Sequence, residues 1–354
     1  MLKIGMPAGS LADPNRGGNL INLLANSGFL VSGYAQGGPS KFTSVNYLFG
    51  WDGRPQEFGA QLAINEIDVA IAGDDWIRER ILEMQLEYGK TVELECVLKL
   101  KRGGVQLVGI VESNEFNTVE DFLKNLCSQK PLITVVTEMP YLTLHWLRTK
   151  LKELGLLDRY NSFSVQKYKT PSKIESGIVI YETWGKTEAK IKNGGADIGL
   201  EITQSGSAIK NYGLKIIDTV MQSQTSIWIN TAVKKDKDKR ELLDMFLLNL
   251  YGSINAEDKM MVMFNVSNKK VDEIDRYLRE KNLFADEPTV SVGKEFTVYN
   301  VQIDAGNIYE PLAKVRYELA KRGATSINTL PVQSSIPNLD SITNYELRIT
   351  SYAK

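Results

Sequence analysis

The sequence is poor in the residues that most often carry covalent and metal chemistry. Its 354 residues include one histidine, His145, and two cysteines, Cys96 and Cys127. Two cysteines build neither a disulfide framework nor a thiolate-rich zinc site. A Ser-His-Asp triad would have to use His145, and the HExxH motif is absent. With Leu142 and Trp146 beside it on a stretch with helical character, His145 is assigned a structural or surface role.

An excess of charge and long apolar runs are also missing. Lysine and arginine number 42 against 43 acidic residues, so the net charge of −1 creates no global field that attracts nucleic acid or an anionic membrane. No stretch approaches the roughly 18 to 20 apolar residues of a membrane span. The N-terminus, MLKIGMPAGSLADP, lacks the pattern of a signal peptide. We therefore expect a cytoplasmic protein with no nucleic-acid or membrane partner.

Short apolar runs alternate with helical patterns through the first two-thirds of the chain. Five runs are typical of buried strands: 2–6, 67–73, 105–111, 132–137 and 196–202. This repetition predicts an α/β fold with largely parallel sheets. Ligands of such folds bind at the carboxyl ends of the strands. Asp75, Glu138 and the segment EITQSGSA (201–208) all follow strand ends, which predicts a site there.

The last hundred residues have a different pattern. Strands are expected at 260–266, 289–292, 296–303 and 325–332. Between them lie two helices, with Val271, Ile274 and Leu278 on one apolar face and Leu312, Val315 and Leu319 on the other. The order β-α-β-β-α-β is that of a ferredoxin-like module. Packing or oligomerisation and small-molecule regulation are equally compatible with such a module.

The densest set of motifs lies in YETWGKTEAKIKNGGADIGLEITQSGSAIKNYGLKIIDTVMQSQTSIWIN (181–230). This stretch resembles the long form of the ATP phosphoribosyltransferases of histidine biosynthesis. The matching residues are Gly185, Thr187, Glu188, Asp197, Glu201, Thr203, Ser205, Gly206, Ser207, Gly213, Leu214, Ile217, Asp218, Thr219 and Ser223. Further matches are Arg54, Glu57, Asp68, Gly73, Asp75, Trp76, Thr137, Glu138, Pro140, Leu142 and Thr143. The likeness covers about residues 1–335.

The resemblance implies a two-lobed catalytic core like that of periplasmic binding proteins, followed by a ferredoxin-like regulatory domain. The expected first lobe comprises residues 1–103 with 221–256, and the second lobe comprises 104–220. The regulatory domain is expected at 257–336 and a C-terminal tail at 337–354.

The resemblance also implies a reaction. N1 of the adenine of ATP attacks C1 of phosphoribosyl pyrophosphate (PRPP), pyrophosphate leaves, and 1-(5-phosphoribosyl)-ATP forms. The implied cofactor is Mg²⁺, held mainly by substrate oxygens rather than by the protein. L-histidine is the implied feedback inhibitor, and a homo-oligomer, a hexamer built from dimers, is the implied assembly.

The family likeness assigns roles to individual residues. PRPP contacts are expected from Glu201, Thr203, Gln204, Ser205, Gly206, Ser207 and Ala208, with the segment from 204 onward around the 5′-phosphate. Residues lining the ATP cleft are expected to be Arg54, Asp75, Glu138, Thr143, Thr187 and Glu188. Glu201 and Arg54 would position the reacting groups, without a nucleophilic side chain. Effector contacts are expected from Thr289, Ala324 and Ser326.

The sequence departs from the family pattern in three places. The opening loop, residues 8–11, has no basic residue; Ala208 replaces a hydroxyl; and FNVSNKK lacks an acid that some members carry. A catalytically weakened relative, in which the regulatory module is the active part, is therefore one alternative. A solute-binding protein is another. A type I phosphoribosyltransferase ranks last, because Glu201 stands without a second adjacent acid. For Glu201 and Asp75 helix capping is the competing role, and for Arg54 a surface ion pair.

Overall fold

The computed structural model describes residues 1–12, 18–112, 115–283, 288–336 and 338. The expected C-terminal tail therefore lies almost entirely outside the described residues. The chain divides into two compact units, one formed by residues 1–21 and 30–243 and the other by residues 22–29 and 244–354. Each unit is described by itself below.

The first unit is built on a nine-stranded sheet with the order β4-β1-β5-β11-β6-β10-β7-β9-β8. Its strands are β1 (Leu2–Pro7), β4 (Leu48–Gly53), β5 (Val69–Gly73), β6 (Leu94–Val111), β7 (Leu132–Thr137), β8 (Phe163–Lys167), β9 (Gly177–Glu182), β10 (Ile198–Thr203) and β11 (Lys215–Asn230). Two short strands, β2 (Val31–Ser32) and β3 (Lys41–Phe42), form a separate pair. The strands predicted from apolar runs are all present.

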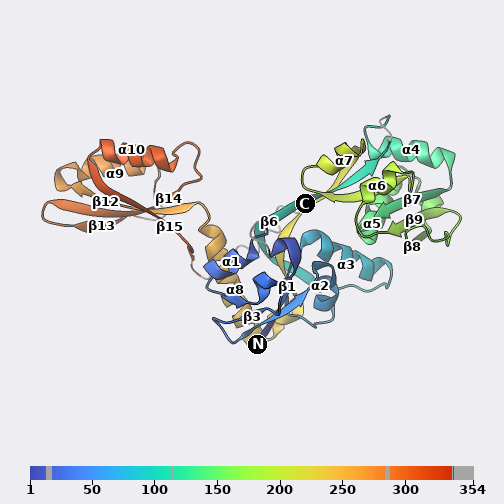
Figure 1. Ribbon diagram of the computed structural model, residues 1–354, viewed down its shortest axis with the longest axis horizontal. Helices are drawn as coiled ribbons and strands as arrows, with labels where there is room; N and C mark the ends of the chain where they lie inside the picture. The colour runs from blue at the N-terminus through green and yellow to red at the C-terminus, as the bar shows by residue number, and fades with distance from the viewer. Residues whose placement is uncertain (13–17, 113–114, 284–287, 337, 339–354) are drawn as a thin grey trace. The chain divides into compact units, whose positions relative to one another are not determined.

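Two long antiparallel strands occupy the centre of this sheet (Figure 1). β6 has 18 residues and β11 has 16, and they pair from Leu94 opposite Asn230 to Val111 opposite Lys215. Outside them, β4-β1-β5 and β10-β7-β9-β8 are parallel. The sheet is therefore largely parallel only in its two outer parts. The sequence prediction began this strand at residue 105, whereas β6 begins at Leu94. Gly103 and Gly104 interrupt the apolar pattern, but the strand continues through them.

Helices alternate with these strands along the chain, and the larger parts of the first and the last of them belong to the second unit. The helices up to residue 255 are α1 (Leu20–Asn26), α2 (Pro55–Ala63), α3 (Asp74–Leu86), α4 (Val119–Gln129), α5 (Pro140–Glu153), α6 (Thr187–Lys192), α7 (Ser207–Asn211) and α8 (Lys237–Asn255). Thr118 caps α4 by accepting from Asp121 N at 3.2 Å, and proline opens α2 and α5, where its missing N–H is no loss. None of the helices in the described ranges has the length and apolar character needed to cross a membrane.

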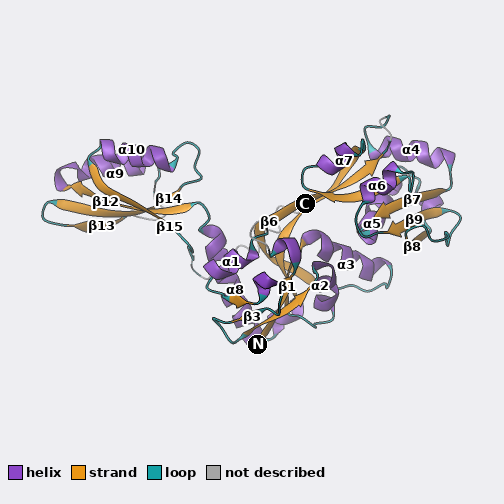
Figure 2. Ribbon diagram, viewed as in Figure 1, coloured by secondary structure: helices purple, strands orange, loops and turns teal. Residues whose placement is uncertain are grey.

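The second unit contains a four-stranded antiparallel sheet with the order β13-β14-β12-β15. Its strands are β12 (Lys259–Ser267), β13 (Thr289–Val292), β14 (Phe296–Asp304) and β15 (Ala324–Pro331). Helices α9 (Val271–Glu280) and α10 (Leu312–Lys321) lie on one face of this sheet (Figure 2). They bury a core that includes Phe264, Ile274, Tyr299 and Leu319. The predicted ferredoxin-like module is confirmed.

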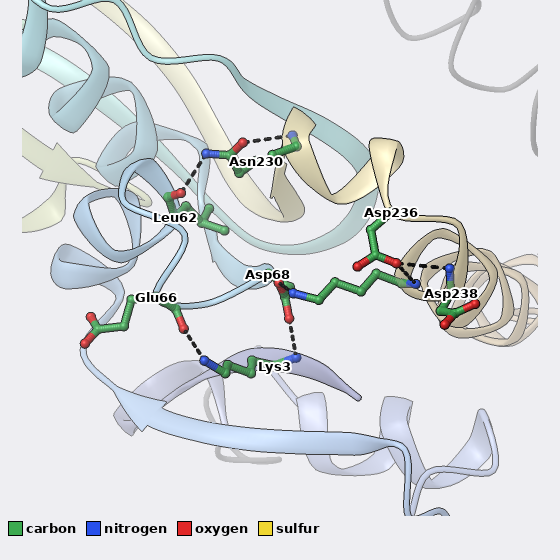
Figure 3. Close-up of polar contacts among 9 residues, drawn as sticks. Lys3, Leu62, Glu66, Asp68, Asn230, Asp236 and Asp238 are labelled. Carbon is green, nitrogen blue, oxygen red and sulfur yellow. Dashed lines mark hydrogen bonds and ion pairs between the residues drawn. The ribbon is translucent and has the colours of Figure 1, made fainter.

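A buried carboxylate fixes the start of the first unit (Figure 3). Asp68 Oδ2 accepts from Lys3 N at 2.9 Å, and Asp68 Oδ1 accepts from Lys239 Nζ at 2.6 Å. The Asp68 side chain is 5% exposed, whereas that of Lys239 is 35% exposed. The carboxylate therefore joins β1, the start of β5 and the first turn of α8 through one side chain.

We expect Asp68→Ala to lower the free energy of unfolding by about 2 to 3 kcal/mol. The substitution leaves Lys3 N–H without its acceptor and removes the ion pair, while Lys239 regains water. Chemical denaturation measures the change. Asp238→Ala, on the exposed surface of the same helix α8, is the matched control and should change stability by less than about 1 kcal/mol. Equal effects of the two substitutions would contradict the anchoring role of Asp68.

Candidate functional site

A cavity of about 680 Å³ lies within the first unit where several strands end. Its wall includes Gly9 after β1, Arg54 before α2, Asp75 after β5, Trp184 after β9 and Gln204 after β10. Both parallel parts of the sheet therefore contribute. The volume falls in the range of small-molecule sites, roughly 300 to 1,000 Å³.

The segment after β10 forms a tight turn, in which Gly206 is buried and the serines on either side of it are exposed. Gly206 has φ +71°, a left-handed conformation that favours glycine. Its N–H donates to Thr203 Oγ1 at 2.8 Å, which closes the turn. Ser205 Oγ and Ser207 Oγ lie 2.8 Å apart, and both serines are exposed. Two hydroxyl groups are thereby presented together to solvent beside Gln204.

Glu201, at the end of β10, lies beside the first turn of α6. Its Oε1 accepts from Ile202 N at 3.0 Å, whereas its Oε2 is buried and accepts no hydrogen bond from a described residue. The hydroxyl of Thr187 is also buried and forms no hydrogen bond of good geometry within the described residues, but it lies close enough to Glu201 to favour the charged carboxylate. Burial, and next the negative charge of Glu188, raise the pKa of Glu201 to about 7. This carboxyl group is thus partly protonated near neutral pH.

Asp75 and Arg54 differ in how strongly the protein holds them. Asp75 is 4% exposed; its N–H donates to Ser223 Oγ at 3.0 Å, and its Oδ1 accepts from Trp76 N at 2.9 Å. Burial raises the pKa of Asp75. Arg54 is exposed; its backbone carbonyl accepts from Glu57 N at 2.9 Å, but its guanidinium forms no hydrogen bond or ion pair with the described part of the chain. Asp75 is a fixed part of the wall, and Arg54 is free to meet an anion.

A second cavity, of about 320 Å³, shares Arg54, Gln56, Trp76 and Trp184 with the first. Glu79 lines it from α3 and accepts from Tyr141 N at 2.9 Å and Leu142 N at 2.7 Å, at the start of α5. Burial raises the pKa of Glu79 to about 8, although both N–H groups favour the charged form. This side chain links a helix after β5 to a helix after β7 beside the cavity.

The comparison with protein families identifies the family of this chain. The model of the family described as ATP phosphoribosyltransferase matches residues 54–252, more than half of the chain. The chain belongs to the ATP phosphoribosyltransferase family. The resemblance inferred from the motifs is thereby confirmed.

Relatives of the ATP phosphoribosyltransferase family align along almost the whole chain. The ATP phosphoribosyltransferase of Nitratidesulfovibrio vulgaris (strain DP4) is 26% identical over 322 residues, which cover 89% of this chain and 92% of that protein. ATP phosphoribosyltransferase 1 of Geobacter sulfurreducens is 27% identical over 345 residues, covering 95% and 99%.

A solved structure has the same fold. The ATP phosphoribosyl transferase (HisG:HisZ) complex from Thermotoga maritima contains a chain with a TM-score of 0.50 and 16% identity. The match covers 72% of this chain and 99% of that chain. The two-lobed α/β core predicted for this ATP phosphoribosyltransferase relative is confirmed.

The residues predicted from the family likeness fall into four groups. The first group lies where β10 joins α7 and comprises Thr203, Ser205, Gly206, Ser207 and Ala208. Arg54, Asp75 and Gln204 line the larger cavity, and Arg54 and Glu138 line the smaller one. Glu201, Thr187 and Glu188 form the carboxylate cluster described above. Thr143 lies elsewhere: it is fully buried on α5, and its hydroxyl donates to Met139 O at 2.6 Å.

The three expected effector residues do not come together within one module. Thr289 begins β13, at one edge of the four-stranded sheet. Ala324 and Ser326 belong to β15, at the opposite edge. Strands β14 and β12 lie between them, so a single module cannot bring all three residues to one small ligand.

Motif matching gave no role to several residues of the cavity walls. Trp184 is one of them, and 78% of its surface is accessible. Glu79 and Gln56 were also missed. The sequence TWGKTE shows a tryptophan between a strand end and a helix start. Nothing in the sequence indicates whether this side chain is exposed or buried.

The described residues hold no preformed metal site of carboxylates, histidines or cysteines in groups of three or more. The nearest acids are already engaged: Asp75 accepts from Trp76 N, and Asp74 accepts from Trp228 Nε1 at 2.9 Å. Oxygen atoms of both carboxyl groups are thus already engaged by the protein, which fits a protein-held Mg²⁺ poorly.

The carboxylate cluster predicts a pH dependence. Glu201 has a folded pKa of about 7, above the ordinary glutamate value of about 4.3 in the unfolded chain. The folded state therefore binds more protons between these values, and the free energy of unfolding should fall as pH rises through this window. Glu188→Gln removes the neighbouring charge, lowers the pKa of Glu201 and should make the fall between pH 5 and pH 7 shallower.

Denaturant unfolding across this pH range, for the wild type and the variant, measures the difference. Other buried carboxyls such as Glu79 contribute equally to both proteins and cancel. Glu112→Gln is the control, because the Glu112 side chain is 52% exposed and pairs with Lys192 on the surface. Identical pH profiles for Glu188→Gln and the wild type would contradict the coupling of the two carboxyls.

Proposed function

We propose that the protein transfers the 5-phosphoribosyl group of PRPP to N1 of ATP, forming 1-(5-phosphoribosyl)-ATP and pyrophosphate, the first step of histidine biosynthesis. The observation that carries this proposal is the turn Thr203–Ser207, which presents two exposed serine hydroxyls at a strand end, beside a cavity with an unpaired arginine, in a chain of this family. The turn would bind PRPP, and the cavity would hold the reacting parts of both substrates.

The 5′-phosphate of PRPP would lie on the loop after β10. The Ser205 and Ser207 hydroxyls point to the same exposed side, and Gly206 keeps the backbone free of a side chain there. Hydroxyl and N–H groups around such a turn favour a bound anion. Ala208 offers no hydroxyl, so this loop would bind the phosphate with one donor fewer than the family pattern. Residues 104–220, the proposed second lobe, supply these contacts.

Glu201 would accept hydrogen bonds from the ribose hydroxyls. Its Oε2 is buried without a donor, and a buried unsatisfied acceptor in a native protein calls for a partner. Ribose hydroxyls would supply that donor and would favour the charged carboxylate. Arg54, from the proposed first lobe, would contact the pyrophosphate or the triphosphate, because its guanidinium is exposed at the cavity and unpaired among the described residues.

The reaction needs little covalent help from the protein. Attack of N1 on C1 and departure of pyrophosphate pass through an oxocarbenium-like state, which is favoured by alignment and by charge stabilisation. The loop would fix one end of PRPP, and Glu201 would face the developing positive charge with a carboxylate. Mg²⁺ bound to the substrate phosphates would neutralise the leaving pyrophosphate. The scarcity of histidine and cysteine is therefore compatible with this chemistry.

We also propose a homo-oligomer and inhibition by L-histidine through the C-terminal module. The ferredoxin-like fold supports a regulatory or assembly role. Because Thr289 and Ser326 lie at opposite edges of its sheet, an effector that contacts both would need two copies of the module.

The activity is tested by mixing the protein with ATP, PRPP, Mg²⁺ and pyrophosphatase and following the absorbance of N1-alkylated adenine. We expect product that depends on both substrates. L-histidine, added in a second series, should lower the rate. Absence of product from a protein with an intact circular dichroism spectrum would instead support the weakened relative suggested by Ala208 and by the uncharged loop at residues 8–11.

We expect Gly206→Asp to weaken PRPP binding by at least about 100-fold, because it places a negative charge against the 5′-phosphate. Gly206→Asn is the matched control, since asparagine has the same size and also tolerates the left-handed backbone. The asparagine variant should bind PRPP distinctly better than the aspartate variant. Isothermal titration with PRPP measures both, and equal affinities would show that no phosphate lies at this loop.

A further inference from the structure

Trp184 is an exposed aromatic side chain on a firmly held backbone. Thr183 N–H donates to Thr137 O at 2.9 Å, which fixes the residue before it. Lys190 Nζ donates to Gly185 O at 2.5 Å, which fixes the residue after it. Gly185 and Lys186 both have positive φ, +73° and +61°, so the chain turns sharply into α6 immediately after the tryptophan.

This backbone leaves the indole in solvent instead of in the core. Trp184 is 78% exposed, and it lines both the larger cavity and the second cavity described above. Tryptophan has the largest apolar surface of any side chain, and a protein that exposes it inside a concave site offers it to a ligand.

A second tryptophan lines the same two cavities. Trp76, in the first turn of α3, is half-buried, and its backbone N–H donates to Asp75 Oδ1 at 2.9 Å. Trp76 follows β5, in one parallel part of the sheet, and Trp184 follows β9, in the other. The shared wall of the two cavities thus carries one indole from each part, with Arg54 between the same two cavities.

We propose that Trp184, together with Trp76, binds the purine base of ATP by stacking where the two cavities meet. The inference rests on the proposed function, and the chemistry of the two substrates decides which of them the indoles bind. PRPP has no aromatic ring, so adenine is the only planar π system available to the indoles. Stacking engages the faces of the base and leaves its N1 edge open for attack on C1. Arg54, which lines the same two cavities, would contact the triphosphate.

The test uses two probes, ATP and inorganic tripolyphosphate, which has the phosphates but no base. Trp184→Ala should weaken ATP binding about 5- to 150-fold, the range seen when a stacking aromatic is truncated. Tripolyphosphate binding should not change. Trp184→Phe keeps a platform and should stay within a few-fold of the wild type for ATP. Tyr88→Ala is the control, because Tyr88 is an aromatic residue 57% exposed outside both cavities.

Fluorescence gives an independent signature. Adenine stacked on an indole quenches it, so ATP should quench the wild type more than Trp184→Phe at saturation, and tripolyphosphate should quench neither. An unchanged ATP affinity in Trp184→Ala would overturn the proposal. So would an equal loss for ATP and tripolyphosphate, which would indicate a role in shaping the site, or a loss confined to PRPP.

The outcomes separate this proposal from the proposed function. A wild type that forms product while Trp184→Ala keeps its KM for ATP would retain the transferase and reject base stacking. A wild type that forms no product but binds ATP through Trp184 would reject the transferase and retain the base-binding site.

Discussion

The pairing of β6 with β11 is the interaction on which the first unit depends. The order β5-β11-β6-β10 places these two strands between the parallel groups, so the groups share no other strand contact in the sheet. The ladder is long, but it is irregular: the register shifts at several points, including between Thr219 and Met221, and Gly103 has a positive φ. Such irregularities add twist and bending to a strand pair. The ladder is continuous but bent, and the loops at the strand ends of both parallel groups line one cavity.

The loops at these strand ends are shaped by a few backbone positions. Gly206 allows the turn that brings Ser205 and Ser207 together, and Gly185 allows the turn that leaves Trp184 in solvent. Both turns follow strands of the same parallel group, β10 and β9. A phosphate-sized anion and a planar base are recognised by different chemistry, hydroxyl groups in one case and an aromatic face in the other. The same fold provides both because each strand end carries its own loop.

Buried carboxyls hold the surroundings of the cavity in place. Asp75 and Glu79 lie on α3. One oxygen of Asp75 and both oxygens of Glu79 accept hydrogen bonds from backbone N–H groups, so these carboxyl groups hold the cavity wall in place and are poorly placed to meet a ligand. Glu201 differs, because one oxygen has no donor among the described residues and a second acid, Glu188, lies beside it. Burial raises the pKa values of Asp75, Glu79 and Glu201. Of these three, only Glu201 has a buried carboxylate oxygen that accepts no hydrogen bond from a described residue. This difference singles out Glu201 among the acids near the cavity.

The sequence alone determined the family, five strands of the first sheet and the position of the loop at 201–208, because each depends on local patterns and on motif spacing. It also identified the ferredoxin-like module, since the alternating and helical periods there are regular. Only the tertiary structure decided that β6 runs antiparallel through Gly103, that Thr143 is in the core, and that Thr289 and Ser326 lie at opposite edges. It alone placed Trp184 in the cavity wall. Exposure and proximity arise from contacts between segments far apart in the chain, and no local pattern contains them.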